Sequence, residues 1–529
     1  MPLPAPRYEK FNRWVIWTVG IMLVVPMFYW FYTAQVWEDF LITFRASHNL
    51  ASGLGLTYEA GTRVYCFTSP LNALLPAFFD WLTKTDSYAV PLGCYNVVAL
   101  AAYAWGGLLT LRLMTEEDGK VGAAAAVFPL LLVLCHRTTA FVVNGQEAGF
   151  WIAFLAASFY CVVRGHDRCW IGAGLSWSGL MWTRPDSFVH IALFACVALA
   201  APARARRAEA MGLLRAAGIC AIGYLPWLVG TWWYYGSPIP HSLQAKIGAY
   251  VGAGLPWQPI PAVVRLRDVF GGMFAPIYGL NDHGWDRLWL WSAAFLGGIA
   301  ALAWAFPQSS RMTRCASACL AGSLVYLGII WSHGTAFPWY FVPAGFFGSL
   351  VLARLPFDGN GRLFGRVIAA SIPLVVAGQF FISATRLSAA QQRIVEEGVR
   401  KPIGLWLRAQ MRPGEHVFLE PIGYIGYFSG ASVFDYPGLV SPDVLRLRRS
   451  GLKFYDLIDS LAPAWLVLRD SEYAGFLRHP QLASQYRLAV VFDECSALAN
   501  APPVRGASFG GDSRFFVLVR ADRPLPAGH

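Results

Sequence analysis

Charged residues are scarce in this 529-residue chain. Only 14% of the residues are Asp, Glu, Lys or Arg, whereas 56% are hydrophobic and 15% are aromatic. Soluble globular domains carry about 25% charged residues, so this composition excludes a soluble enzyme of this length. It predicts a polytopic membrane protein, whose helices bury their apolar side chains in lipid.

Metal and redox motifs are also absent. The ten cysteines form no Cys-x-x-Cys pair, and most of them lie inside apolar segments, where cysteine behaves as a small hydrophobic residue. Only Cys66 and Cys495 fall in segments expected outside the membrane, which leaves a disulfide between them open. The cysteine pattern therefore implies no metal centre.

The basic residues do not indicate a nucleic-acid partner, although the formal net charge is +11. Lys and Arg cluster in short loops between apolar segments, where they set the orientation in the membrane and contact anionic lipid. We therefore expect membrane lipids as partners, and no nucleic acid.

Apolar segments predict about eleven transmembrane helices. They cover residues 13–33, 88–113, 120–136, 147–164, 169–183, 186–203, 211–234, 286–306, 314–333, 337–355 and 364–384. With eleven spans, every cluster of Lys and Arg falls on one side, which the positive-inside rule assigns to the cytoplasm. The N-terminus is then cytoplasmic, and residues 34–87, residues 235–285 and the tail after residue 385 lie on the outer side.

The region after residue 385 is less apolar and predicts a small α/β domain. Five short β-rich runs lie in it, at Val417–Glu420, Ser432–Phe434, Trp465–Arg469, Leu488–Phe492 and Phe515–Val519. The predicted fold class is therefore a polytopic α-helical membrane domain, residues 1–385, followed by a C-terminal α/β domain on the outer side, residues 386–529.

The first outer loop begins with two adjacent carboxylates, Glu38 and Asp39, directly after the first apolar segment. At a membrane edge such acids are poorly solvated and can serve as proton acceptors. The alternative is that they only begin a helix in solvent. Arg45 and His48 at helical spacing, and the Gly and Pro residues as far as Pro70, favour an ordered functional loop.

This loop also carries a recognisable pattern. It reads acid-Asp-Phe-x-Ile-Thr-Phe-Arg-x-x-x-Asn-Leu-x-x-Gly-x-Gly-Leu, then Gly-x-Arg-Val and Thr-Ser-Pro-Leu. The pattern resembles the first periplasmic loop of bacterial GT-C glycosyltransferases, above all the arabinofuranosyl- and mannosyltransferases that use polyprenyl-phosphate sugars. Those proteins usually show Asp-Asp where this chain has Glu38 and Asp39, so either carboxylate fits the role of base.

The resemblance implies a GT-C fold in a bacterial inner membrane, with the C-terminal domain in the periplasm. It implies inverting transfer of a sugar from a polyprenyl monophosphate to a hydroxyl of a periplasmic glycan, lipid or protein. Arabinofuranose is the first choice of sugar, and mannose or another hexose is the alternative. The predicted cytoplasmic loops support a lipid-borne sugar, because they are too short for a nucleotide-sugar-binding domain and contain neither a Gly-rich phosphate loop nor an Asp-x-Asp motif.

Four basic residues are candidates for binding the donor phosphate: Arg184, Lys246, His241 and Arg45. Arg184 lies in a Thr-Arg-Pro-Asp turn that recurs at this place in the family that the first loop resembles. A guanidinium group forms bidentate hydrogen bonds to phosphate oxygens. Lys246 and His241 lie in a stretch similar to the family's Tyr-Gly-x-x-x-Pro-Asn-Thr-x-x-x-Lys. The alternatives are an ion pair within the turn for Arg184 and interfacial snorkelling for Lys246.

Three further residues are second-rank site candidates: Glu147, Asp186 and His333. Glu147 opens an apolar segment and His333 ends one, so both also fit simple partners of a helix dipole. We predict no cofactor. Glu38, Asp39 and Asp186 are able to share a divalent metal, but no spacing requires one.

Two other classes of function compete with a transferase. A flippase or polymerase of lipid-linked glycans would place ionisable residues along many spans, whereas here they lie at the edges of outer loops. A non-catalytic membrane scaffold would not depend on Glu38, Asp39 or Lys246.

Overall fold

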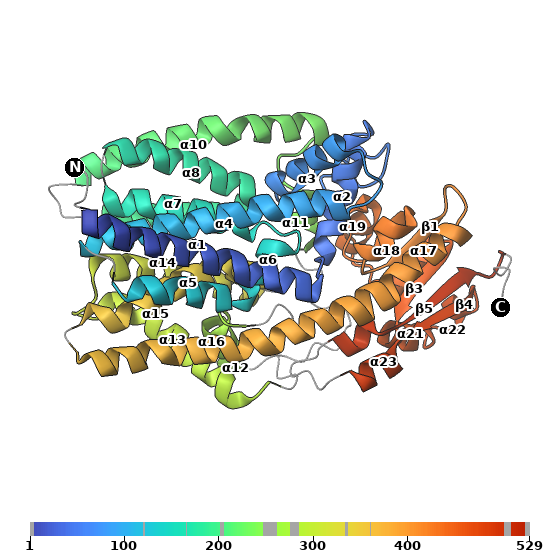
Figure 1. Cartoon of the computed structure of the whole chain (residues 1–529). Coiled ribbons are helices and arrows are strands. Elements are labelled where there is room, and N and C mark those ends of the chain that lie inside the picture. Colours follow the sequence, from blue (N-terminus) through green and yellow to red (C-terminus); the bar gives the residue numbers. More distant parts are fainter. Residues whose placement is uncertain are drawn as a thin grey trace.

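The computed structural model describes residues 5–119, 122–165, 167–200, 206–246, 262–275, 285–333, 337–359, 361–501 and 509–523. A bundle of long helices forms one part of the molecule, and a small sheet with short helices lies beyond one end of it (Figure 1). The helix α1 begins at the end of the bundle that is remote from the sheet.

Helices occur at every predicted apolar segment, because a helix satisfies all its backbone hydrogen bonds internally in lipid. The helices of the bundle are α1 (Ala5–Thr33), α4 (Ala89–Asp118), α5 (Ala124–Leu134), α6 (His136–Val143), α7 (Ala148–Arg164), α8 (Asp167–Thr183), α9 (Phe188–Leu199), α10 (Arg206–Tyr235), α12 (Ala262–Gly271), α13 (Arg287–Leu302), α14 (Arg311–His333), α15 (Val342–Asp358) and α16 (Leu363–Gln391). Short 3₁₀ turns precede α9 and α15, at Pro185–Ser187 and Pro338–Phe341.

The length and apolar composition of its helices identify this chain as a multi-pass membrane protein. Within the described ranges, seven helices are long and apolar enough to cross a membrane, or eight if α5 and α6, which meet at a 68° bend, form one broken span. Both α7 and the segment Pro185–Leu199 are shorter apolar helices. The number of eleven crossings and their orientation stay predictions.

Three short helices gather at the end of the bundle that faces the sheet (Figure 1). They are α2 (Glu38–Ala51), α3 (Pro70–Thr83) and α11 (His241–Lys246). The start of α3 is capped by Ser69, whose side chain accepts a hydrogen bond from the Asn72 N–H. The two outer loops predicted to carry functional residues therefore meet at one end of the bundle.

The transition to the C-terminal region is a continuous helix. From α16 the chain passes through a π-helix, Gln392–Arg400, into α17 (Lys401–Gln410), so the helix crosses the predicted domain boundary at residue 386 without a break. A proline usually breaks a helix, so its presence at position 402 predicts a break that does not occur here. Pro402 lies in the first turn of α17, where its missing N–H costs little.

The predicted strands are confirmed. They are β1 (His416–Leu419), β2 (Ser432–Asp435), β3 (Trp465–Arg469), β4 (Tyr486–Asp493) and β5 (Arg514–Arg520), in the sheet order β2-β1-β3-β5-β4. The pairs β1–β2 and β1–β3 are parallel, and β5 is antiparallel to both of its neighbours. Short helices connect the strands: α18 (Tyr424–Ser429), α19 (Pro442–Arg449), α20 (Phe454–Leu461), α21 (Asp470–Phe476), α22 (Pro480–Ala483) and α23 (Cys495–Asn500).

All ten cysteines are free thiols, so the disulfide between Cys66 and Cys495 does not form. Cys66 is buried in the loop between α2 and α3, whereas the Cys495 sulfur lies 3.3 Å from the Ser513 hydroxyl oxygen in the C-terminal region.

Close packing of α4 against α7 depends on Gly149. A Cβ atom at this residue would overlap the carbonyl oxygen of Ala99, a backbone atom that has no freedom to rotate away. Gly93, in contrast, is a helical glycine of α4 with open space where its Cβ would lie. Alanine substitutions at these two positions therefore separate the cost of a clash between helices from the gain in helix propensity.

We expect Gly149→Ala to lower the unfolding free energy by about 1–3 kcal/mol, because overpacking forces the two helices apart. The matched control Gly93→Ala should be neutral or slightly stabilising, because alanine favours a helix more than glycine does. Thermal unfolding of both variants in the same detergent measures the difference. Equal melting temperatures would contradict the packing argument.

Candidate active site

The two adjacent carboxylates at the start of α2 have different surroundings. Glu38 faces the C-terminal region: its carboxylate accepts a hydrogen bond from the Arg400 guanidinium, and a second one from the Gly423 N–H at 3.1 Å. The backbone of Gly423 packs so closely on Glu38 that a Cβ atom there would overlap it. Asp39 turns instead into a narrow cavity at the end of the bundle.

The cavity is built from segments that are far apart in the sequence. Asp39 and Thr43 come from α2, Glu147 from the turn before α7, Arg184 from the turn between α8 and α9, and Lys246 from α11. Its other polar lining residues are Thr68, Ser69, Asn72, Gln146 and Ser242. The structure thus brings together four of the residues that the sequence analysis selected.

Lys246 pairs with Asp39 in the cavity. Its Nζ lies 3.8 Å from an Asp39 carboxylate oxygen and 4.9 Å from the ring centres of both Phe337 and Trp339. Burial lowers the pKa of Lys246, and the attraction of the Asp39 carboxylate opposes this shift. A desolvated ammonium group attracts a phosphate more strongly than an exposed one does, because less water screens it.

Arg184 is held on several sides. It is 4% exposed and donates to Glu147 at 2.7 Å and to Asp186 at 2.9 Å. Its guanidinium carbon lies 5.1 Å from the Trp151 ring centre and 5.0 Å from that of Tyr340. The ion pair within the turn, predicted as an alternative, therefore forms, and Arg184 lines the cavity as well.

Glu147 has two polar partners in this arrangement. Besides Arg184, its carboxylate accepts a hydrogen bond from the Asn72 side-chain amide at 3.4 Å. Glu147 thereby joins the start of α3 to the turn that carries Arg184. The Glu147 carboxylate is therefore placed to orient the Arg184 guanidinium.

Three other predicted residues lie away from the Asp39 cavity or cannot be placed. Arg45 donates to the carbonyl oxygens of Gly426 and Ala431, at 2.8 and 2.9 Å, and ties α2 to α18. The N–H of His241 donates to the Tyr65 carbonyl oxygen at 2.9 Å, and burial lowers the pKa of its ring. His333 ends α14, and its side chain lies outside the described residues.

Sequence reasoning missed Arg400 and the aromatic pair Phe337 and Trp339. Arg400 follows Glu396 at helical spacing, and its guanidinium pairs with that residue at 2.9 Å, so its local pattern looked like an ordinary surface pair. The Phe-Pro-Trp sequence at 337–339 is typical of aromatic residues at a membrane interface, but it does not predict a contact with Lys246.

A divalent metal shared by Glu38, Asp39 and Asp186, considered from the sequence, stays a hypothesis. In this structure Glu38 pairs with Arg400, and Asp186 pairs with Arg184. Across the part of the chain that the structure describes, no three His, Cys, Asp or Glu side chains gather as a set of metal ligands.

Comparison with known proteins identifies the fold. The crystal structure of ArnT from Cupriavidus metallidurans bound to undecaprenyl phosphate is similar with a TM-score of 0.55 and 12% identity, over 98% of this chain and 100% of that one. The Archaeoglobus fulgidus oligosaccharyltransferase in its apo form is similar with a TM-score of 0.53 and 13% identity, over 97% of this chain and 75% of that one. This chain has the GT-C fold.

A third structure is the same Archaeoglobus fulgidus enzyme, tethered to an acceptor peptide that contains the NVT sequon. Its TM-score is 0.52 and its identity 12%, over 90% of this chain and 72% of that one. A family model described as a domain of unknown function, DUF8728, matches residues 387–516. No curated protein matches the sequence. The predicted fold class, a GT-C membrane protein with a C-terminal sheet, is confirmed.

The unequal roles of Glu38 and Asp39 can be measured as stability. Glu38→Gln leaves Arg400 buried beside a neutral amide and should lower the unfolding free energy by about 1–3 kcal/mol. Asp39→Asn removes a partly exposed ion pair that contributes at most about 1 kcal/mol. We expect a clear drop in melting temperature in detergent for the first variant only. The assignment fails if Asp39→Asn destabilises the protein as much as Glu38→Gln.

Proposed function

We propose that this protein is a membrane glycosyltransferase that transfers a sugar from a polyprenyl monophosphate to a hydroxyl of an acceptor on the periplasmic side. The observation that carries this proposal is the convergence of Asp39, Lys246 and Arg184 on one cavity. A carboxylate beside two restrained cations is what such a transfer needs: a base for the acceptor and positive charge for the departing phosphate. The fold shared with ArnT, which was crystallised with undecaprenyl phosphate, supports a lipid-borne donor.

In this proposal Lys246 and Arg184 bind the donor phosphate. The bond between the anomeric carbon and the phosphate oxygen breaks, and its electron pair stays on the polyprenyl phosphate. The two cations balance the charge that develops on this group, so it leaves without being protonated. The Lys246 ammonium lies 4.9 Å from the ring centres of both Phe337 and Trp339, and these two rings hold it at the cavity.

Asp39 acts as the base in the same step. As the acceptor oxygen bonds to the anomeric carbon from the opposite face, its proton passes to the Asp39 carboxylate, and the configuration inverts. Glu38 is assigned a structural role because its carboxylate is occupied by Arg400 and the Gly423 N–H. Glu147 and Asp186 orient Arg184, while Arg45 and His241 have no direct contact with the donor.

Arabinofuranose remains our first choice of sugar, on the motif in the first loop, with mannose or another hexose as the alternative. The acceptor is a periplasmic glycan, lipid or protein. The protein is placed in a bacterial inner membrane with its N-terminus in the cytoplasm, as a transmembrane catalytic domain at 1–385 and a periplasmic domain at 386–529. The competing flippase or polymerase of lipid-linked glycans would not require Asp39.

The decisive experiment offers the purified protein arabinofuranosyl, mannosyl and other polyprenyl-phosphate sugars, together with an envelope extract as acceptor. Release of polyprenyl phosphate, followed by mass spectrometry, reports the reaction. Asp39→Asn should lower kcat about 100-fold or more, because it removes the base. Glu38→Gln, assayed below its melting temperature, should keep most of the activity, because its amide oxygen still accepts a hydrogen bond from Arg400 or the Gly423 N–H and so holds the start of α2. Unchanged turnover in Asp39→Asn would rule out this mechanism and favour a flippase.

The phosphate-binding role of Lys246 predicts a different kinetic signature. Lys246→Met preserves the apolar stem and removes the charge, so the KM for the lipid donor should rise about tenfold or more. Arg449→Met, a control at an exposed cation near α11, should leave this KM unchanged. If both variants behave alike, Lys246 does not contact the donor.

A further inference from the structure

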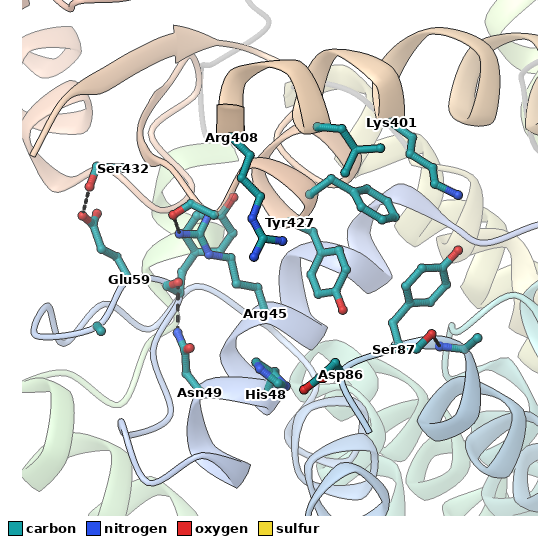
Figure 2. A pocket seen from close by; sticks show the side chains of 17 residues that line it. Arg45, His48, Asn49, Glu59, Asp86, Ser87, Lys401, Arg408, Tyr427 and Ser432 are labelled. Carbon is teal, nitrogen blue, oxygen red and sulfur yellow. Dashed lines mark hydrogen bonds between the residues drawn. The ribbon is translucent and has the colours of Figure 1, made fainter. Parts of the chain in front are cut away.

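We propose that a second cavity, lined by a different face of α2, binds an uncharged oligosaccharide, the acceptor glycan. The cavity has a volume of about 1030 Å³ and lies between α2, the connection from α3 to α4, and the helices α17 and α18 (Figure 2). This size exceeds what a single sugar fills and falls at the upper end of the range for small-ligand sites. Its role in the reaction rests on the proposed function, whereas its affinity for glycans does not.

Aromatic rings form one wall of this cavity. Tyr88 stands nearly perpendicular to Tyr427, with ring centres 5.7 Å apart, and nearly perpendicular to Phe428, at 6.0 Å. Side chains in this edge-to-face arrangement present their faces in different directions. The C–H face of a sugar ring is apolar and packs on such a surface.

Opposing charges face each other across the cavity. Figure 2 shows Arg408 and Tyr427 pointing into it from α17 and α18, with His48 and Asp86 on the opposite side. Within the described parts of the chain, neither Arg408 nor Asp86 forms an ion pair. A guanidinium supplies several N–H donors in one plane and a carboxylate supplies two acceptor oxygens, so the pair suits neighbouring hydroxyls, which both donate and accept.

The other charged side chains that line the cavity already have polar partners. Arg45 donates to backbone carbonyl oxygens, Lys401 pairs with Glu397 at 2.7 Å, and Glu59 accepts a hydrogen bond from Ser432. His48 lies 2.8 Å from Asp80. Hydrogen bonds to neutral groups leave a charge in place, so Arg45 and Glu59 contribute one charge of each sign, as do Arg408 and Asp86. This balance favours an uncharged ligand over a lipid phosphate.

The distance along α2 sets the length of the ligand. A helix rises about 1.5 Å per residue, so His48 in this cavity and Asp39 in the other are separated by roughly 14 Å along the axis. One sugar unit is too short to bridge them. An acceptor that is gripped by the aromatic wall and presents its reacting hydroxyl to Asp39 is therefore an oligosaccharide of several units.

The test uses the full-length protein in detergent, applied to an array of bacterial envelope glycans from disaccharides to octasaccharides. Inorganic phosphate and a serine- and threonine-containing peptide serve as competing probes. We expect neutral glycans of three or more units to bind, and Tyr427→Ala and Arg408→Ala each to weaken binding about tenfold. Arg412→Ala, at an exposed arginine that does not line the cavity, and Asp39→Asn should bind as the wild type does.

The inference is overturned if no glycan binds, if phosphate or the peptide is preferred, or if neither Tyr427→Ala nor Arg408→Ala weakens binding. Arg408 is exposed, so its variant remains informative even if Tyr427→Ala folds poorly. Glycan binding without sugar transfer from any donor would refute the proposed reaction and keep this site. Transfer without glycan binding at the cavity would refute the site alone.

Discussion

The contact between Glu38 and Arg400 connects the start of α2 to the C-terminal region, and the arrangement of the candidate active site depends on it. Arg400 is 6% exposed and also pairs with Glu396 at 2.9 Å and Asp512 at 3.0 Å. Through Asp512 this network reaches Arg469, which pairs with Glu420 and Glu472. Buried charges are costly unless they are paired, so the network holds the start of α2 in one orientation and leaves Asp39 facing the cavity.

The helix α2 separates two chemically different surfaces. Around Asp39 the surroundings are rich in ionisable groups, with Lys246 and Arg184 restrained by aromatic rings. Around His48 the surroundings are aromatic and nearly balanced in charge. One helix is thus able to present a phosphate-bearing donor on one face and a hydroxyl-rich acceptor on another.

Aromatic rings restrain the cations of the site in a way that ion pairs alone would not. A lysine or arginine over a ring face keeps its charge while its position is fixed, since the ring quadrupole attracts the cation without neutralising it. Lys246 between Phe337 and Trp339, and Arg184 between Trp151 and Tyr340, both follow this arrangement. Lys246, which lies 3.8 Å from the Asp39 carboxylate, thus keeps positive charge available to a phosphate, whereas Arg184 is also paired with Glu147 and Asp186.

The apolar helices, the five strands and the membership of Asp39, Glu147, Arg184 and Lys246 in one site could be predicted from the sequence. Hydropathy, strand patterning and local motifs depend on residues near one another in the chain, so they can be read without a structure. Which of Glu38 and Asp39 would line the cavity could not be predicted, because adjacent residues on a helix point in directions about 100° apart. Only the tertiary structure decided it, by placing Arg400, a residue 362 positions away, beside Glu38. The contact of Arg45 with α18 likewise depends on long-range packing, so no local sequence pattern predicts it.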